Sequence, residues 1–329
     1  MRIAFLTEMG FVGKVPANHP NMRTEFAWMH ALDADHYNIH MFDTNLKGYD
    51  HVFIIFPKGK TFLNSEGSTL VKGVNPVSEL LRKPLVQKIK DSGNGNVHYV
   101  QEGPHWWWND YEVADQIYFY NFLGSCDSIF THNTTDVAYY KGLFPNKSIR
   151  PIGTLMIDTL IKGIQPTKEH KAIIGGNFAR WYGGFESYMV ADNFDCEIWA
   201  QTSHAMRIGE DSVDGIKHLP RMMWNDWMKS LSTFKYGVHL MPTVAAGTFA
   251  LNCAYFGIPC IGNEDVDTQL LCHPSLSVEV HDIAMARDLA IRLRDDEYFY
   301  NQCSELAREK YQQFYSVESW KKRMENYLK

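Results

Sequence analysis

The sequence lacks any apolar run that approaches the roughly 20 residues of a membrane-spanning helix. Its first residues, MRIAFLTEMG, predict a strand and a turn and resemble neither a signal peptide nor a transit peptide. Cysteine is scarce, with six residues scattered along 329 and no CxxC pair or histidine at metal-binding spacing. We therefore expect reduced core cysteines, no bound metal and a cytoplasmic protein without a membrane span.

A basic overall charge is also missing. The net charge of −6 excludes a globally nucleic-acid-binding surface, although residues 47–90 hold eight Lys or Arg against three Asp or Glu, a local charge of +5. This segment is either a solvated surface or a surface that binds the successive phosphates of a polyanionic ligand. What the chain does have is a hydrophobic share of 45%, with 9 Trp, 17 Tyr and 19 Phe, which excludes disorder and suits a globular enzyme.

Predicted strands alternate with predicted helices along the whole chain, which is typical of a parallel α/β architecture. The best boundary lies within residues 151–170, which contain Gly153, Gly163 and Pro166. We expect strands at 2–7, 36–42, 51–56, 97–101, 128–131, 149–152, 171–175, 196–200, 237–241 and 259–262. We expect helices at 24–32, 85–91, 113–123, 136–142, 186–192, 222–231, 248–256, 284–294, 297–314 and 319–328.

Residues 240–262, LMPTVAAGTFALNCAYFGIPCIG, form the most informative segment. A strand ends before Pro242, a turn of small residues follows, and a helix then runs to the capping residue Gly257. A turn without bulky side chains lets the N–H groups at a helix N-terminus face an anion, which the helix dipole also favours. The segment therefore predicts an anion-binding turn, with Thr243, Gly247 and Thr248 as its candidate contacts with a phosphate.

A glycine-rich stretch, GGNFARWYGGF at 175–185, also lies between a predicted strand and a predicted helix. Gly176 would allow the backbone to approach a phosphate, and Arg180 would supply a cation. The alternative is that Arg180 is an exposed residue at a helix start. Farther along, Lys217-His218-Leu219-Pro220 is expected to be the loop before the helix at 222–231.

The stretch VQEGPHWWW at 100–108 lies where a buried strand is expected to end, the usual place for active-site groups in an open α/β sheet. Glu102 and His105 are candidates to take a proton from an attacking hydroxyl. Three consecutive Trp cannot all point into one core, so one should face a cleft and stack on a sugar or a base. The alternative is a set of ordinary core aromatics. The N-terminal loop with Gly10, Gly13 and Lys14 is expected to lie at the same edge of the sheet, and the resemblance described next implies that it faces the sugar donor.

These segments together resemble GT-B glycosyltransferases, and their layout is similar to that of the DNA α-glucosyltransferases of T-even-type bacteriophages. The resemblance rests on Gln101 to His105, on Ile129-Phe130-Thr131-His132, and loosely on Trp181-Tyr182-Gly183-Gly184-Phe185. Where many GT-B enzymes carry an Arg and a Lys in the glycine-rich loop, this chain has Asn177 and Tyr182. Arg180 must then carry the charge.

The same resemblance implies further donor contacts. It places His218 near the nucleotide base, although a surface histidine is the alternative. Asn252 stands where many retaining enzymes have a Glu that binds the ribose hydroxyls, and Val244 replaces a second Glu.

The resemblance implies an α/β fold of the GT-B class, with two Rossmann-like domains facing across a cleft. Residues 1–152 would form the acceptor-side domain, 153–315 the nucleotide-sugar-binding domain, and 316–329 a helix crossing back. The implied activity is metal-independent transfer of a sugar from a nucleoside-diphosphate sugar, taken as UDP-linked, to an acceptor hydroxyl. That acceptor would be 5-hydroxymethylcytosine in double-stranded phage DNA, in the host cytoplasm. A carbohydrate or lipid-linked glycan acceptor, and a non-catalytic nucleotide-sugar-binding protein, are the alternatives.

Overall fold

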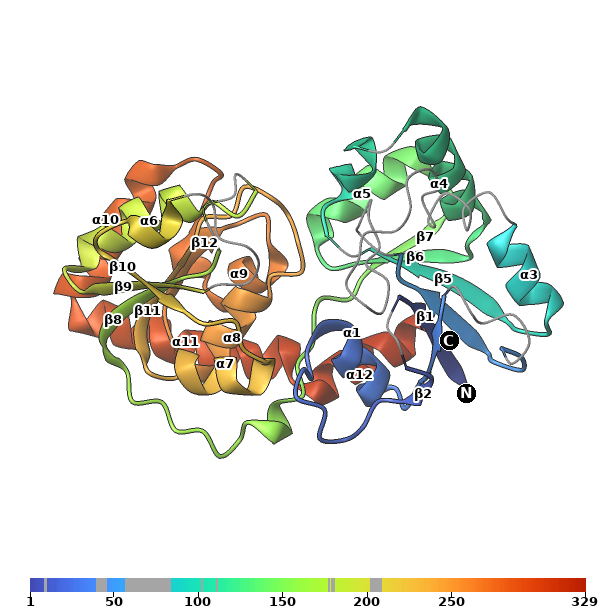
Figure 1. The fold of residues 1–329 in the computed structure, drawn as a ribbon, viewed down its shortest axis with the longest axis horizontal. Helices are drawn as coiled ribbons and strands as arrows, with labels where there is room; N and C mark the ends of the chain where they lie inside the picture. The colour runs from blue at the N-terminus through green and yellow to red at the C-terminus, as the bar shows by residue number, and fades with distance from the viewer. Residues whose placement is uncertain are drawn as a thin grey trace. The chain divides into compact units, whose positions relative to one another are not determined.

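The computed structural model describes residues 1–8, 11–39, 46–56, 84–101, 103–110, 112–176, 178, 181–201 and 209–329. The chain divides into two compact units. Unit 1 comprises Met1–Ala17, Met29–Ile152 and Met324–Lys329, and unit 2 comprises Asn18–Trp28 and Gly153–Arg323. Each unit is built around its own sheet (Figure 1).

The described part of unit 1 contains one seven-stranded sheet in the order β2-β3-β1-β4-β5-β6-β7. Neighbouring strands are parallel, except that the short β2 is antiparallel to β3. Strands of a parallel sheet read as apolar runs because both faces are covered, and all five residues of β1 are buried. The strands are β1 Ile3–Thr7, β2 Gly13–Lys14, β3 Asp35–Asn38, β4 His51–Ile54, β5 Asn96–Val100, β6 Ser128–Thr131 and β7 Ser148–Pro151.

The helices around this sheet include α3, α4 and α5, and Phe144, which follows α5, stacks on Tyr120 of α4 with ring centroids 4.8 Å apart. Two helices, α1 and α12, run from one unit into the other. The last residues of the chain pack on β7, where the Tyr327 hydroxyl donates to the C=O of Pro151 over 3.2 Å. The bounds are α1 Thr24–Ala31, α3 Leu85–Asp91, the 3₁₀ helix η1 His105–Asp110, α4 Val113–Ser125, α5 Thr134–Leu143 and α12 Val317–Tyr327.

The described part of unit 2 contains a six-stranded parallel sheet in the order β10-β9-β8-β11-β12-β13. Figure 1 shows α6 and α10 on one side of this sheet and α7, α8 and α11 on the other. The strands are β8 Glu169–Ile174, β9 Glu197–Gln201, β10 Ile216–Leu219, β11 Phe234–His239, β12 Cys260–Asn263 and β13 Ser277–Val278. The helices are α6 Gly184–Ala191, α7 Trp224–Leu231, α8 Thr248–Phe256, α9 Asp267–Cys272, α10 Ile283–Asp295 and α11 Glu297–Tyr315.

The predicted parallel α/β architecture is confirmed, and most predicted elements are present within a few residues of their expected ends. Helix α8 has the predicted bounds, and Gly257 ends it in the left-handed conformation with φ 63°. Such C-terminal glycines are favoured because a Cβ is unfavourable at positive φ. Part of the predicted strand at 36–42 lies outside the described residues.

One expectation about the organisation of unit 2 is wrong. Residues Lys217–Leu219 belong to the edge strand β10 rather than to a loop, and they pair with β9. This strand was not recognised because it contains charged and polar side chains. An edge strand can carry them, since it is buried only in part. The short α9 and the two-residue β2 and β13 were not predicted either, since so few residues carry no periodic signal.

Candidate functional site

The sheet of unit 2 reverses its direction of growth between β8 and β11. From β8 the chain builds outward through β9 and β10, and from β11 it builds outward through β12 and β13 on the other side. Ligands of open α/β sheets bind outside the carboxyl ends of the strands at such a switch point. Two segments follow those ends, the described residues 175, 176, 178 and 181–183 after β8 and residues 240–247 after β11. We call these two segments, together with the first turn of α8, the switch-point site.

Several glycines are needed here because the two segments touch. A Cβ on Gly175 would lie 2.6 Å from Cγ of His239 and 2.7 Å from Cγ of Phe249. Gly183 has φ 63°, and a Cβ there would overlap the C=O of Leu240. The hydroxyl of Ser187 accepts a hydrogen bond from the N–H of Leu240 over 2.9 Å. The glycines therefore allow close packing of the two segments.

The start of α8 has no side-chain cap. Its N-cap residue, Gly247, has no side chain to cap the helix, and the first turn contains no acidic residue. The first N–H groups of a helix have no partner inside the helix, and the dipole places partial positive charge there. Thr243 is buried and Thr248 half-buried beside this turn. The predicted contact residues Thr243, Gly247 and Thr248 therefore all lie in the segment that leads into α8 or in its first turn, and their contact with a phosphate stays a prediction.

Gly247 is required for a reason that the sequence did not reveal. We expected its small size to leave room for a phosphate. In the structure φ is 68°, and a Cβ would overlap Oγ1 of Thr268 and approach Cγ1 of Val266 to 2.5 Å. The Thr268 hydroxyl also donates to the C=O of Gly247 over 2.8 Å. A larger side chain at 247 would thus collide with the segment around the start of α9.

Below this turn lies a small cavity of about 10 Å³, lined by residues that include His239, Ala250 and Gln269. That volume is the size that one water molecule needs. Nε2 of His239 and Oε1 of Gln269 are buried without a hydrogen-bond partner among the described residues. Burial lowers the pKa of His239 to about 4, so the ring is neutral near pH 7. Gly176, on the β8 side, packs against Tyr182.

The remaining predicted donor contacts have different surroundings. Asn252 is buried on α8, with 2% of its surface exposed. His218 lies near the carboxyl end of β10, two strands away from β8. Its Nε2 is 3.3 Å from Oε1 of the buried Glu210. Glu210 lies in a short 3₁₀ turn that the sequence did not indicate. Asn177 and Arg180 lie outside the described residues, so their roles stay predictions.

In unit 1 a second group of polar residues follows β5 and β6. Gln101 is buried after β5, and its Nε2 donates to the C=O of Gly103 over 2.8 Å. His105 begins η1, and its Nδ1 lies 3.1 Å from Oδ1 of Asp136 in the first turn of α5. Asp136 could not be recognised as a site residue from the sequence, because an Asp at a helix start usually compensates the helix dipole. Glu102, the other proposed base, lies outside the described residues.

The aromatic residues of η1 divide between the core and its rim. Trp108 is buried and stacks on Phe119 with ring centroids 3.7 Å apart. Trp106 and Trp107 are half-buried, and Trp107 packs against the core. On the other side of His105, the half-exposed ring of Tyr139 stacks on the imidazole at 4.2 Å. The three tryptophans are thus not all fully buried, and the expectation that one of them faces a cleft stays a prediction.

The end of the N-terminal loop, Gly13 and Lys14, does not lie at the carboxyl edge of the sheet where it was expected. Lys14 is on β2 opposite Asp35, the first residue of β3, so it is near the amino end of that parallel strand. Its Nζ is 3.1 Å from Asp33 and 3.4 Å from Asp35, which satisfy its charge. Gly13 has φ 98° and open space around it, and Gly10 is outside the described residues. We therefore do not place Lys14 at a carboxyl-end site.

Most of the basic segment also lies outside the described residues, including Lys58, Lys60 and Lys83. Within the described part of the segment, Lys88 and Lys90 are in the last turn of α3. Lys90 is 2.8 Å from Asp127, so one of these charges is already paired. The choice between a solvated surface and a phosphate-binding face stays open.

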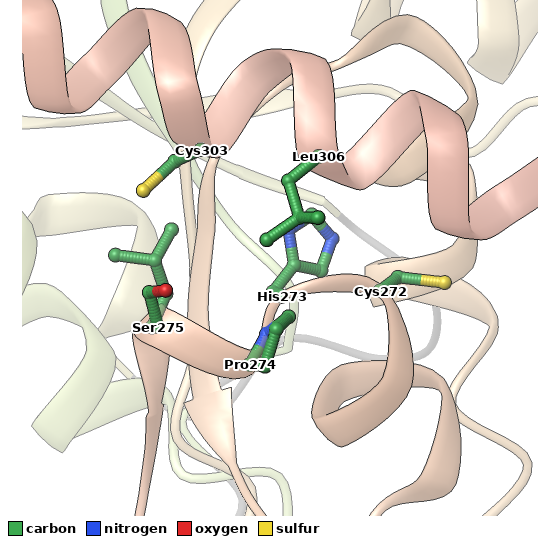
Figure 2. A pocket seen from close by; sticks show the side chains of 7 residues that line it. Cys272, His273, Pro274, Ser275, Cys303 and Leu306 are labelled. Atoms are coloured by element: carbon green, nitrogen blue, oxygen red, sulfur yellow. The ribbon is translucent and has the colours of Figure 1, made fainter.

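Another depression, between α9 and α11, contains no internal volume. Figure 2 shows that the thiols of Cys272 and Cys303 point away from each other in it. Burial raises the pKa of Cys272 to about 12 and that of Cys303 to about 11, which keeps both thiols protonated and unreactive. This depression is a packing feature.

Two general features bear on the class of site. No helix in the described ranges combines the length and apolar character that crossing a bilayer requires. In the same ranges, no cluster of three or more His, Cys, Asp or Glu side chains is arranged for a metal ion. The sequence does contain the Asp-x-Asp triplets 33–35 and 265–267, whose paired carboxylates would suit a divalent cation. The first of these pairs is bound to Lys14 instead.

Comparisons with known proteins connect this geometry to a fold. No family model and no curated protein matches the sequence. Among solved structures, a sucrose-phosphate synthase from Thermosynechococcus elongatus has a TM-score of 0.63 at 13% identity, covering 99% of this chain and 98% of its own. An α,α-trehalose 6-phosphate synthase from Burkholderia multivorans has a TM-score of 0.64 at 8% identity, with 99% and 98% covered.

A third solved structure is an α-glucosyltransferase in complex with UDP and a 13-mer DNA containing an HMU base. Its TM-score is 0.62 at 11% identity, and the match covers 100% of this chain and 99% of that one. At such identities the likeness establishes the fold, and it extends over the full length of all three proteins. The expected similarity in layout to a DNA α-glucosyltransferase is confirmed, and the chain has the two-sheet α/β GT-B fold.

Proposed function

We propose that the protein is a glycosyltransferase that moves a sugar from a nucleoside-diphosphate sugar to an acceptor hydroxyl. The observation that carries this proposal is the uncapped start of α8 at the β8–β11 switch point. Its N–H groups and dipole suit the diphosphate of the donor. The same groups would stabilise the negative charge that develops on the diphosphate as the bond to the sugar breaks.

The donor is proposed to be UDP-linked. Similar structures support this, since one contains UDP and another is named as a UDP-forming trehalose-phosphate synthase. Thr243 and Thr248 are proposed to donate to the phosphates, with Gly176 allowing close backbone approach. Arg180, Asn177, His218 and Asn252 stay predicted donor contacts, to be tested by nucleotide binding to their variants.

For the acceptor we propose 5-hydroxymethylcytosine in double-stranded DNA. Support comes from the full-length likeness to a structure whose DNA contains an HMU base. Such an acceptor base must leave the helix stack to reach an active site, and partly exposed aromatic rings such as Trp106 could receive it. The fold does not require DNA, because the likeness to the two sugar-phosphate synthases is equally extensive.

A carbohydrate acceptor is therefore the second candidate, and it is supported by those two synthases. A non-catalytic nucleotide-sugar-binding protein is the third candidate, since Val244 and Asn252 stand where many enzymes of the family that the sequence resembles have two Glu residues. A cytoplasmic location and independence of metal ions remain predictions.

The proposal is tested by following UDP release from UDP-glucose and related donors. Each donor is incubated alone, with DNA containing 5-hydroxymethylcytosine, with unmodified DNA of the same sequence, and with sugar phosphates. Release that depends on the modified DNA supports the first acceptor, and release that depends on a sugar supports the second. If UDP binds but no incubation releases UDP from a donor, the proposed transferase activity is contradicted and the non-catalytic nucleotide-sugar-binding protein is supported.

A further inference from the structure

The pairing of His105 with Asp136 joins two elements that are far apart in the sequence. His105 is at the start of η1 after β5, and Asp136 is in the first turn of α5 after β6. Their Nδ1 and Oδ1 atoms are 3.1 Å apart. Because β5 and β6 are neighbouring parallel strands, their carboxyl ends bring the two side chains to one edge of the sheet.

The carboxylate of Asp136 is buried beside His105. Its side chain is 1% exposed, and its second oxygen, Oδ2, is buried without a partner among the described residues. A buried carboxylate with so few hydrogen bonds is costly for stability, and such groups are concentrated at functional sites. The position at the N-terminus of α5 offsets part of that cost through the helix dipole.

The pair also determines the tautomer of His105. An ionised carboxylate can only accept, so Nδ1 must carry the hydrogen that lies between the two groups. The lone pair of the neutral ring is then on Nε2. The side chain is 33% exposed, and the stacked ring of Tyr139 restricts its rotation. An imidazole held in this way is suited to accept a proton from a hydroxyl.

We propose that Asp136 is a positioning residue that holds His105 ready to take the proton of the acceptor hydroxyl. In this step the acceptor oxygen forms a bond to the anomeric carbon, and the bond between that carbon and the diphosphate oxygen breaks. The diphosphate leaves with the electron pair, and the proton passes to Nε2 of His105 and then to solvent. This inference rests on the proposed function and assigns it a base and an orienting group.

The first measurement does not depend on activity. Protein labelled with ¹⁵N-histidine is examined by NMR at neutral pH, and the His105 signals are assigned by their loss in His105→Asn. We expect the Nδ1–H tautomer in the wild type and a mixture with the Nε2–H tautomer in Asp136→Ala. Asp127→Asn is the control, since Asp127 is a half-buried carboxylate of unit 1 that is held by Lys90 at the amino edge of the sheet, away from His105.

The second measurement is steady-state kinetics with the acceptor that supports transfer. Asp136→Ala should lower kcat by about 10²-fold or more while the KM for the donor stays within about twofold, the pattern of a lost orienting group. Asp136→Asn, which keeps the shape of the side chain, serves if the alanine variant does not fold. A wild-type ring in the Nε2–H form, or variants with unchanged kcat, would overturn the pairing. An absence of transfer to every acceptor, with the Nδ1–H tautomer present, would instead contradict the proposed function.

Discussion

The hydroxyl of Ser187 on α6 accepts a hydrogen bond from the backbone N–H of Leu240, the first residue after β11. Ser187 is fully buried, and Leu240 is 9% exposed. This bond joins the helix that follows the β8 segment to the segment that leads into α8. It therefore connects the two parts of the switch-point site.

Ser187→Ala should lower the free energy of unfolding by about 1–3 kcal/mol, because it leaves a buried N–H without a partner. It should also weaken UDP binding by loosening the 240–247 segment. Urea denaturation and calorimetry measure the two effects. Ser92→Ala is the control, since its hydroxyl makes an exposed bond to Lys88 and its loss should change little. Equal stability of both variants would contradict the role of Ser187.

Gly247→Ala should destabilise the protein more than Gly13→Ala does. Both glycines have positive φ, so each alanine carries a conformational cost of about 1–2 kcal/mol. Only at 247 does the new Cβ overlap a neighbour, Thr268, whereas open space surrounds Gly13. Thermal unfolding of the two variants checks the difference. If both variants unfold at the same temperature, the inferred close contact between position 247 and Thr268 is contradicted.

Thr248→Glu should change stability and donor binding in opposite directions. A carboxylate in the first turn of α8 interacts favourably with the helix dipole and should stabilise the folded protein by about 0.3–1 kcal/mol. The same charge should repel the diphosphate and reduce UDP affinity by more than tenfold. Thr248→Gln has similar size without the charge and serves as the control. Unchanged UDP affinity in the Glu variant would place the diphosphate elsewhere.

Stability should fall as the pH decreases from about 6.5. Burial lowers the pKa of His98 to about 3 and the pKa values of His239 and His273 to about 4. Between those values and 6.5, the unfolded chain binds more protons than the folded one, so acid favours unfolding. Each histidine contributes a slope of about 1.4 kcal/mol per pH unit in that window.

Denaturation of wild type and His273→Gln between pH 7 and 4.5 tests this dependence. Gln can still donate to the C=O of Ala250, which lies 3.0 Å from Nε2 of His273. The variant should therefore lose about a third of the slope that these three histidines produce. An unchanged slope would show that His273 is not buried in its neutral form.

Sugar transfer should persist in the presence of EDTA. The proposed mechanism stabilises the leaving diphosphate with the α8 dipole and backbone N–H groups, so a divalent cation has no required role. Activity after chelation, with and without added Mg²⁺ or Mn²⁺, measures this. Loss on chelation with recovery by either cation would contradict it, and would direct attention to the Asp-x-Asp triplet at 265–267.

Local signals in the sequence were sufficient for most of the helices and strands and for their order along the chain. Helix α8 could be predicted to the residue, because small residues precede it and Gly257 ends it. The apolar runs at 2–7, 51–56 and 237–241 predicted buried strands, which are present as β1, β4 and β11, since strands of a parallel sheet are buried on both faces. These features depend on residues close together in the chain. Strand β10 and the short β13 could not be predicted in this way, because pairing with a neighbour, rather than composition, makes them strands.

The contacts within the candidate sites were decided by tertiary structure. His105 and Asp136 are 31 residues apart and meet only because β5 and β6 are adjacent. Gly247 could be recognised as a residue of a turn, but its collision partner Thr268 is 21 residues away on α9. Lys14 had the right charge for a phosphate, yet the antiparallel pairing of β2 places it against Asp33 and Asp35. A sequence specifies which chemical groups are present and their local backbone conformation, while strand order determines which of those groups come within bonding distance.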